Sequence, residues 1–334
     1  MTYTVGGLIQ ATDYNGFVST TAGANVNATW GQAGTTTSGY GQGNVTTVST
    51  AATITATNWA TLVNTVGSMA SHQGTSITSR TAPVTGNTIA ILSNLNTDIT
   101  SCFTNRNNAA ASGTQYGIFT GTTSKTTATG SGSTTWTITF THTITWANNA
   151  AFNNFFNAGA LIKWETSKTA DTTAADTEWN DLANTLVGDI YITGAAAAKT
   201  IAAISYTGTT KSGGTGTPTT LSTATGAYAL TTTATTLYKQ FADTAPYTGQ
   251  FIQLDAAVNS NSAPTVMTLT TTWTDPGASG EGSSDDISGG TAVTSPATSI
   301  GAATAPTTLV TYFPPSTTYL SSSWGTPTIA ASVA

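Results

Sequence analysis

Charged residues are scarce in this chain of 334 residues. Lysine, arginine, aspartate and glutamate make up 7% of it, against about 25% in an average soluble protein. The eight basic residues are scattered, and the formal net charge is −6. A nucleic-acid partner is therefore not expected, because binding one requires a basic stripe that neutralises several phosphates. Solubility must come from hydroxyl and amide groups instead.

Cysteine and histidine are almost absent. The single cysteine, Cys102, allows no intramolecular disulfide, so packing alone must hold the fold. His72 falls near the end of a predicted helix, where a positive charge is favourable. His142 falls on the apolar face of a predicted strand, and we interpret it as a core residue rather than as the base of a catalytic triad. No cysteine or histidine cluster has the spacing of a zinc site.

Long apolar runs are missing too. No segment approaches the roughly 20 apolar residues of a membrane-spanning helix. The first seven residues show no basic segment followed by an apolar run, as an ordinary secretory signal would. The Thr-, Ser- and Asn-rich composition is nevertheless typical of proteins that work outside cells. Together these features predict no membrane partner and a protein that is made in the cytoplasm and released by lysis.

Threonine replaces the missing charge, and its branched side chain suits pleated sheets. The clearest strand spans 136–146, where mostly apolar residues alternate strictly with threonines. Other strands are predicted at 160–167, 188–193, 200–207, 227–238, 250–258 and 265–274, with weaker ones at 291–294 and 307–312. A helix is predicted at 173–187. Short strands separated by Gly, Pro and Ser turns indicate an antiparallel, jelly-roll-like β-sandwich.

The first hundred residues have a helical pattern. Residues 9–20 align without a gap with residues 54–65, and both copies place an aromatic and two apolar residues on one helical face. The second copy predicts a helix over about 57–73. Another helix is predicted after Asn87, ending near Asn107. Their apolar faces would pack together as a small helical unit.

A Gly-, Ser- and Thr-rich stretch without periodicity separates the two patterns. The fold class we predict is α+β, mainly β. An N-terminal helical unit for docking or oligomerisation spans 1–111, a linker or long loop spans 112–133, and a β-sandwich region spans 134–334. A further division near 210–225 is left open.

No pattern predicts a catalytic, cofactor-binding or metal-ligating site, so the chain is expected not to be an enzyme and to need no cofactor. The turn Gly39-Tyr40-Gly41-Gln42-Gly43 lacks the Lys-Thr of a phosphate loop and is interpreted as a tight surface turn.

A solvated helix face explains four acidic residues near 173–187: Asp171, Asp176, Glu178 and Asp181.

A second acidic group, in a Gly- and Ser-rich stretch, offers the oxygen ligands that calcium prefers. Its members are Asp275, Glu281, Asp285 and Asp286. Their spacing does not match an EF-hand loop, and an ordinary loop is the favoured interpretation.

Aromatic residues at strand ends and turns can stack on sugar rings or pack at subunit interfaces. The candidates for an assembly or glycan contact are Tyr228, Tyr238, Tyr247, Tyr312, Tyr319 and Trp324. The sequence does not separate such contacts from core packing. A structural subunit and a carbohydrate-binding module are both left open.

Several segments resemble virion structural proteins of marine tailed phages, especially cyanophages. They are Val5-Gly6-Gly7-Leu8-Ile9, Phe155-Phe156-Asn157-Ala158-Gly159 and the stretches 13–18, 58–64, 309–314 and 322–328. The resemblance spans nearly the whole chain, although Gly159-Ala160 stands where a Gly pair is expected.

The resemblance implies a tail-fibre-like or other surface subunit of the virion, present in repeated copies and without a cofactor. A homo-oligomer is expected, with a trimer natural for a fibre, alongside other virion proteins. A host surface glycan is the alternative partner. Tail fibre, baseplate, collar and capsid surface all stay open as locations.

Overall fold

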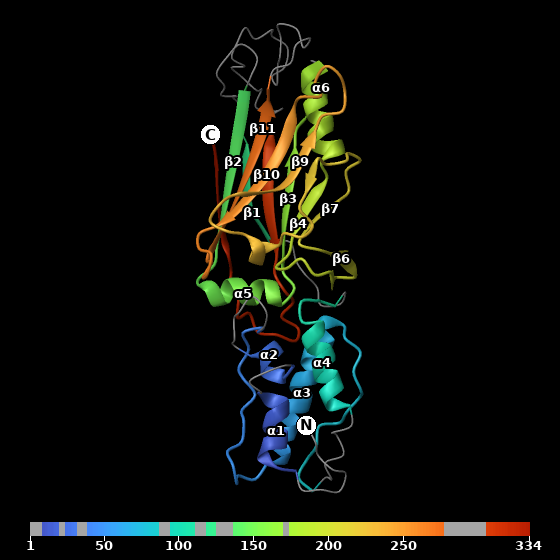
Figure 1. Cartoon of the computed structure of the whole chain (residues 1–334), viewed down its shortest axis with the longest axis vertical. Helices are drawn as coiled ribbons and strands as arrows, with labels where there is room; N and C mark the ends of the chain where they lie inside the picture. The colour runs from blue at the N-terminus through green and yellow to red at the C-terminus, as the bar shows by residue number, and fades with distance from the viewer. Residues whose placement is uncertain are drawn as a thin grey trace.

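Helices occupy one end of the elongated molecule and most strands the other (Figure 1). The computed structural model describes residues 9–19, 24–31, 39–86, 94–110, 118–124, 136–169, 174–276 and 305–334. The fold is mainly antiparallel β with helices, as the sequence predicts. Within these residues no helix has the length and apolar character needed to cross a membrane.

Four helices come from the first 110 residues: α1 (Ala11–Val18), α2 (Val26–Trp30), α3 (Ala56–Gln73) and α4 (Leu95–Thr104). The sequence repeat builds α1 and α3, which begin at equivalent positions. In each, the third helical residue bonds back to the cap, with Asp13 Oδ2 accepting from Gln10 N at 3.0 Å and Asn58 Oδ1 from Thr55 N at 2.9 Å.

The two copies of the repeat pack on each other. The matched aromatic rings of Tyr14 and Trp59 meet edge to face, with centroids 5.2 Å apart. The short helix α2, capped by Asn25, was not predicted. The helix expected after Asn87 begins only at Leu95, behind the left-handed Asn94, and residues 87–93 lie outside the described residues.

The strands form two antiparallel sheets and a hairpin. The first sheet has the order β1 (Ile118–Ser124), β12 (Thr307–Phe313), β3 (Leu161–Ser167), β4 (Asp189–Ile192), β7 (Thr209–Ser212). The second has the order β13 (Thr328–Val333), β2 (Trp136–Thr145), β11 (Val266–Asp275), β10 (Phe251–Val258), β9 (Thr235–Phe241), β8 (Thr220–Leu221). The hairpin pairs β5 (Lys199–Ile201) with β6 (Ile204–Tyr206).

Further helices border the sheets. They are α5 (Asn149–Asn157), α6 (Ala174–Asp181), the π-helical turn η1 (Leu182–Leu186) that continues α6, and the short 3-10 turn η2 (Ala227–Ala229). The helix predicted at 173–187 is confirmed by α6 and η1. Helix α5 crosses the end of the sheets that faces the N-terminal helices (Figure 1).

The inner faces of the sheets pack through Trp164 of β3. Its indole Nε1 donates to Thr271 Oγ1 on β11 at 2.7 Å, and its ring lies 6.0 Å from that of Tyr238 on β9. The alternation predicted for β2 is confirmed, because its buried residues alternate with partly exposed threonines. The core is thus a layer of aromatic and aliphatic side chains between two sheets.

The strand order does not confirm the predicted jelly roll, because pairs of distant strands are combined with meanders. Strand β12 lies between β1 and β3, and β11 lies beside β2, so strands distant in sequence pair there. Elsewhere the sheets are meanders, with β3, β4 and β7 adjacent in one and β8 to β11 adjacent in the other. Between β7 and β8, within the stretch 210–225, the chain passes from the first sheet to the second.

The linker predicted at 112–133 is wrong for part of its length. Residues 118–124 form β1, which pairs with β12 along its whole length. A bulge between Phe119 and Gly121 shifts the register, and such a shift breaks the period of two that reveals a strand in sequence.

Other strand predictions also needed correction. The stretch 200–207 is the hairpin β5–β6, which turns at the positive-φ residues Ala202 and Ala203. The stretch 227–238 begins with η2 and enters β9 only at Thr235. The strand expected at 291–294 lies outside the described residues, and α5, β7, β8 and β13 were not predicted.

We expect Thr271→Val to lower the free energy of unfolding by about 1–3 kcal/mol, because it keeps the shape but leaves the buried Trp164 N–H without an acceptor. The matched control is Thr270→Val on the outer face of β11, which should change stability by less than about 0.5 kcal/mol. Urea unfolding followed by tryptophan fluorescence measures both. Equal effects of the two variants would contradict the role given to the indole hydrogen bond.

Candidate functional site

The six predicted contact residues do not share one surface. Tyr238, Tyr312 and Trp324 are core residues, respectively 0%, 1% and 2% exposed. Tyr228 is half-buried, and its Oη donates to Asn153 O at 3.0 Å and to Asn157 Oδ1 at 2.9 Å. In the described structure this phenol is therefore used to hold α5.

The other two candidates are more accessible, with Tyr247 half-buried and Tyr319 40% exposed. Tyr319 lies in the loop between β12 and β13. The same loop encloses a hollow of about 220 Å³, whose lining includes Tyr312, Trp324 and Pro315. The buried Oη of Tyr312 has no hydrogen-bond partner in the described structure. The hollow is thus walled by residues of this loop, but the Tyr312 hydroxyl and the rings of Tyr312 and Trp324 are themselves buried, so the exposed ring that the loop offers to a sugar is that of Tyr319.

Both histidines are buried. His142 lies on the inner face of β2, as predicted. His72 was expected to act as a cation at the end of its helix, and the structure overturns this. Its Nε2 donates to Ala158 O at 2.9 Å, while Nδ1 has no partner in the described structure. Burial lowers the pKa of His72, so the neutral ring holds α3 against the residue that follows α5.

The turn at residues 39–43 is not a surface turn, because Tyr40 and Gln42 are buried. Gln42 Oε1 accepts from Ser321 N at 2.8 Å, and its Nε2 donates to Ser321 O at 2.9 Å. Gly41, with φ +70°, lies so close to Ser323 that a side chain would clash with it. These contacts join the helical end to the C-terminal loop, and no local sequence signal marks them.

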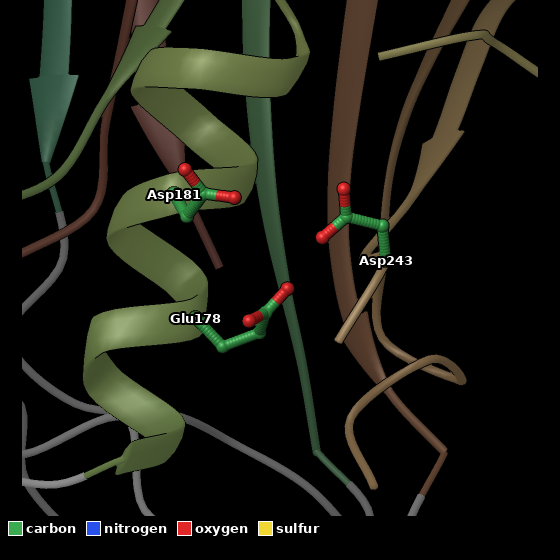
Figure 2. Close-up of side chains that lie close together, drawn as sticks. All are labelled: Glu178, Asp181 and Asp243. Atoms are coloured by element: carbon green, nitrogen blue, oxygen red, sulfur yellow. The ribbon is translucent and has the colours of Figure 1, made fainter. Parts of the chain in front are cut away.

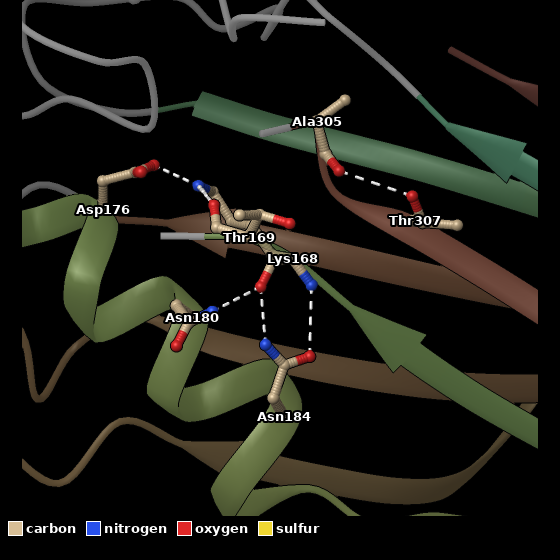
Figure 3. A network of polar contacts seen from close by, with 7 residues as sticks. All are labelled: Lys168, Thr169, Asp176, Asn180, Asn184, Ala305 and Thr307. Carbon is tan, nitrogen blue, oxygen red and sulfur yellow. Dashed lines mark hydrogen bonds and ion pairs between the residues drawn. The ribbon is translucent and has the colours of Figure 1, made fainter. Parts of the chain in front are cut away.

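The acidic residues of α6 do not form the solvated face that we expected. Asp176 and its partner Lys168 both have fully buried side chains, and Lys168 Nζ contacts Asp176 Oδ1 (Figure 3). The Lys168 carbonyl also accepts from the side chains of Asn180 and Asn184. This network fixes α6 to the end of β3. The physical reason is Trp179, which stacks on the sheet and draws the neighbouring carboxylates inward.

A second acidic group gathers at the same helix. Carboxylate oxygens of Glu178, Asp181 and Asp243 all lie within 4.8 Å of one another, and the three side chains converge on the gap between α6 and the loop after β9 (Figure 2). Glu178 and Asp181 share a helix face because they are three residues apart. Asp243 is 62 positions or more away in sequence, so the cluster has no local motif.

The environments of these carboxylates differ. Glu178 is buried, Asp181 half-buried and Asp243 exposed. Burial raises the pKa of Glu178, hydrogen bonds from Thr244 and from the Asp243 backbone partly oppose this, and the Asp243 charge raises it further. Glu178 Oε1 has no hydrogen-bond partner in the described structure.

Of the second acidic group predicted from the sequence, the structure describes Asp275. Asp275 is buried at the end of β11, and its Oδ2 accepts from Gln250 Nε2 at 2.7 Å. It therefore points into the core rather than into a solvent-facing calcium loop. Glu281, Asp285, Asp286 and also Asp171 lie outside the described residues.

Comparison with known proteins yields no match. No protein-family model fits the chain, and neither a curated protein nor a solved structure is significantly similar to it. Function must therefore be argued from the residues and their geometry.

We expect the protein to lose stability as the pH falls below about 6.5, the ordinary pKa of histidine. Because the pKa of buried His72 is lowered, the unfolded chain binds a proton in this window and the folded chain does not. The loss is at most about 1.4 kcal/mol per pH unit. Urea unfolding between pH 7.5 and 5.5 measures it, and His72→Gln, whose amide can still donate to Ala158 O, should show a flatter profile. Parallel profiles would contradict the assignment.

Proposed function

We propose that this chain is a non-enzymatic structural subunit of a bacteriophage particle, a tail-fibre or other surface-appendage protein that assembles with copies of itself. The observation that carries the proposal is an uncharged face of hydroxyl and small side chains on the second sheet. Support also comes from the two-ended shape of the molecule (Figure 1) and from the resemblance of sequence segments to phage virion proteins.

The uncharged face covers the outer side of β13, β2 and β11. Four threonines of β2 are paired across the strands with four threonines of β11: Thr137 with Thr274, Thr139 with Thr272, Thr141 with Thr270 and Thr143 with Thr268. On β13 the outward positions are Thr328, Ala330 and Ser332. None of these outward residues is charged, and the threonine pairs stabilise the sheet itself.

Such a face suits repeated assembly of identical subunits. Copies whose patches meet around a shared symmetry axis bring like charges together, and this patch has none to repel. Its hydroxyl groups can bond to one another or to bridging water. A charged partner such as nucleic acid gains nothing from the face. In this proposal the N-terminal helices dock on the particle or oligomerise, and a jelly-roll-like sandwich is displayed outward on the virion.

The alternative function is binding of a host surface glycan. The loop between β12 and β13 favours it, because the ring of Tyr319 is exposed there and the hollow in the same loop is lined in part by proline rings. A glycan site on a virion subunit is compatible with assembly through the uncharged face, since the two use different surfaces.

We expect the purified protein to form a homo-oligomer, with a trimer as the natural state for a fibre. Thr139→Lys together with Thr143→Lys should convert it to monomers, because two positive charges then face the same charges on the next copy. Light scattering after size-exclusion chromatography measures the mass. The control carries Thr233→Lys and Thr248→Lys in exposed loops and should stay oligomeric. The proposal is contradicted if the wild-type protein is monomeric and immunogold labelling does not detect it on particles.

For the alternative, a glycan array of host surface polysaccharides should show binding that Tyr319→Ala reduces at least tenfold, because the exposed ring of the loop between β12 and β13 is lost. Tyr247→Ala, which removes a ring outside this loop, is the matched control. Binding that both variants keep, or no binding at all, would exclude this loop as a glycan site.

A further inference from the structure

Three negative groups lie together on the side of the molecule formed by α6 and the loop after β9. Oxygens of Glu178, Asp181 and Asp243 fall within 4.8 Å of one another. The groups that act electrostatically on Glu178 include the Asp243 carboxylate and no basic side chain. Like charges at this separation repel. Hydrogen bonds from Thr244 and the Asp243 backbone offset part of this repulsion, and a bound cation would offset the rest.

One oxygen of the cluster lacks a partner. Glu178 is 6% exposed, and its Oε1 is fully buried without a hydrogen-bond donor in the described structure. The side chain points into the gap between α6 and the loop that carries Asp243 (Figure 2). Buried side-chain acceptors are nearly always paired. An unpaired oxygen on a buried carboxylate that lies beside two other carboxylates therefore indicates a place for a cation.

We propose that Glu178, Asp181 and Asp243 bind a divalent cation, and that this cation is calcium. All three ligands are carboxylate oxygens, which calcium prefers, whereas zinc sites are built mainly from histidine nitrogen and cysteine sulfur. Two oxygens on one calcium at about 2.4 Å each lie no more than about 4.8 Å apart, and the three carboxylates meet this limit. The exposure of Asp243 leaves room for the water molecules that complete a calcium shell.

The bound cation cross-links two elements that are distant in sequence. Asp181 is the last residue of α6, directly before the π-helical turn η1, and such turns occur often at functional sites. Asp243 belongs to the segment between β9 and β10. Calcium thus holds α6 to the six-stranded sheet beside the Lys168–Asp176 pair. This inference does not rest on the role in a virion.

The test uses the full chain after removal of metal with EDTA. Terbium, which replaces calcium at oxygen sites, should give luminescence sensitised by the nearby Trp179, and calcium should displace it. Calorimetric titration with calcium chloride should give one site per chain, and calcium should raise the thermal unfolding temperature. Magnesium should bind at least tenfold more weakly, because it demands tighter octahedral geometry.

Two variants and one control locate the site. Glu178→Gln and Asp243→Asn each remove one negative charge without changing side-chain size, and each should weaken calcium binding at least tenfold. Because Asp243 is exposed, its variant tests the site even where the buried Glu178→Gln disturbs folding. Asp255→Asn, which changes a carboxylate of β10 bonded to Thr236 and Gln253, should bind calcium like the wild type.

The proposal is overturned by a wild-type chain that binds no calcium at millimolar concentration, or by calcium binding that both cluster variants retain. Equal or tighter binding of magnesium overturns the assignment to calcium. A cluster compensated by a proton would instead give an EDTA-treated protein that gains stability through Glu178 as the pH falls, with no response to calcium, and this result also overturns the proposal.

Discussion

The packing of tryptophans between and around the two sheets is the interaction on which the rest of this structure depends. With few charges and no disulfide available, the fold is held by apolar contact, and six tryptophans are among its most fully buried side chains. Trp179 stacks on Trp273 at 5.6 Å and lies 5.0 Å from Trp136. These contacts hold α6 against the six-stranded sheet. The positions of Asp176 and Glu178 follow from them, because both residues lie within one turn before Trp179 on the same helix.

Some of the few charges that the chain has lie inside it. Buried charged residues include Asp98, Lys168, Asp176, Glu178, Lys199 and Asp275. Burying a charge is costly unless it is paired. A buried charge therefore requires polar partners at defined positions, as Lys168 has in Asp176 and two asparagines. The buried charges leave fewer charged groups on the described surface, although Asp181 and Asp243 still gather there. The same residues therefore add specific contacts to the interior and lower the charge of the surface.

The helices and strands that a local periodicity marks could be predicted from the sequence. The contacts between residues that are far apart in the sequence could not. Strand β2 and helix α3 were found within a residue or so of their ends, because strict alternation and a capped amphipathic run are local signals. Strand β1 was hidden by its bulge. The hydrogen bond between Gln42 and Ser321 joins residues 279 positions apart. Asp243 lies near Glu178 and Asp181 only because the fold brings the segment after β9 beside α6. Such contacts have no pattern in a single sequence.

The same limit explains why the helix at 173–187 was predicted and its chemistry was misread. The apolar positions Trp179, Leu182 and Leu186 locate one buried face, and carboxylates off that face are ordinarily solvated. Here η1 changes the helical period directly after Asp181, and a loop closes over the second face, so Glu178 is buried as well. Because α6 lies at the end of the molecule away from the N-terminal helices (Figure 1), the two ends differ in chemistry. The neutral hydrogen bonds of Gln42 join the helical end to the loop between β12 and β13, whereas the carboxylates gather beside α6 at the other end.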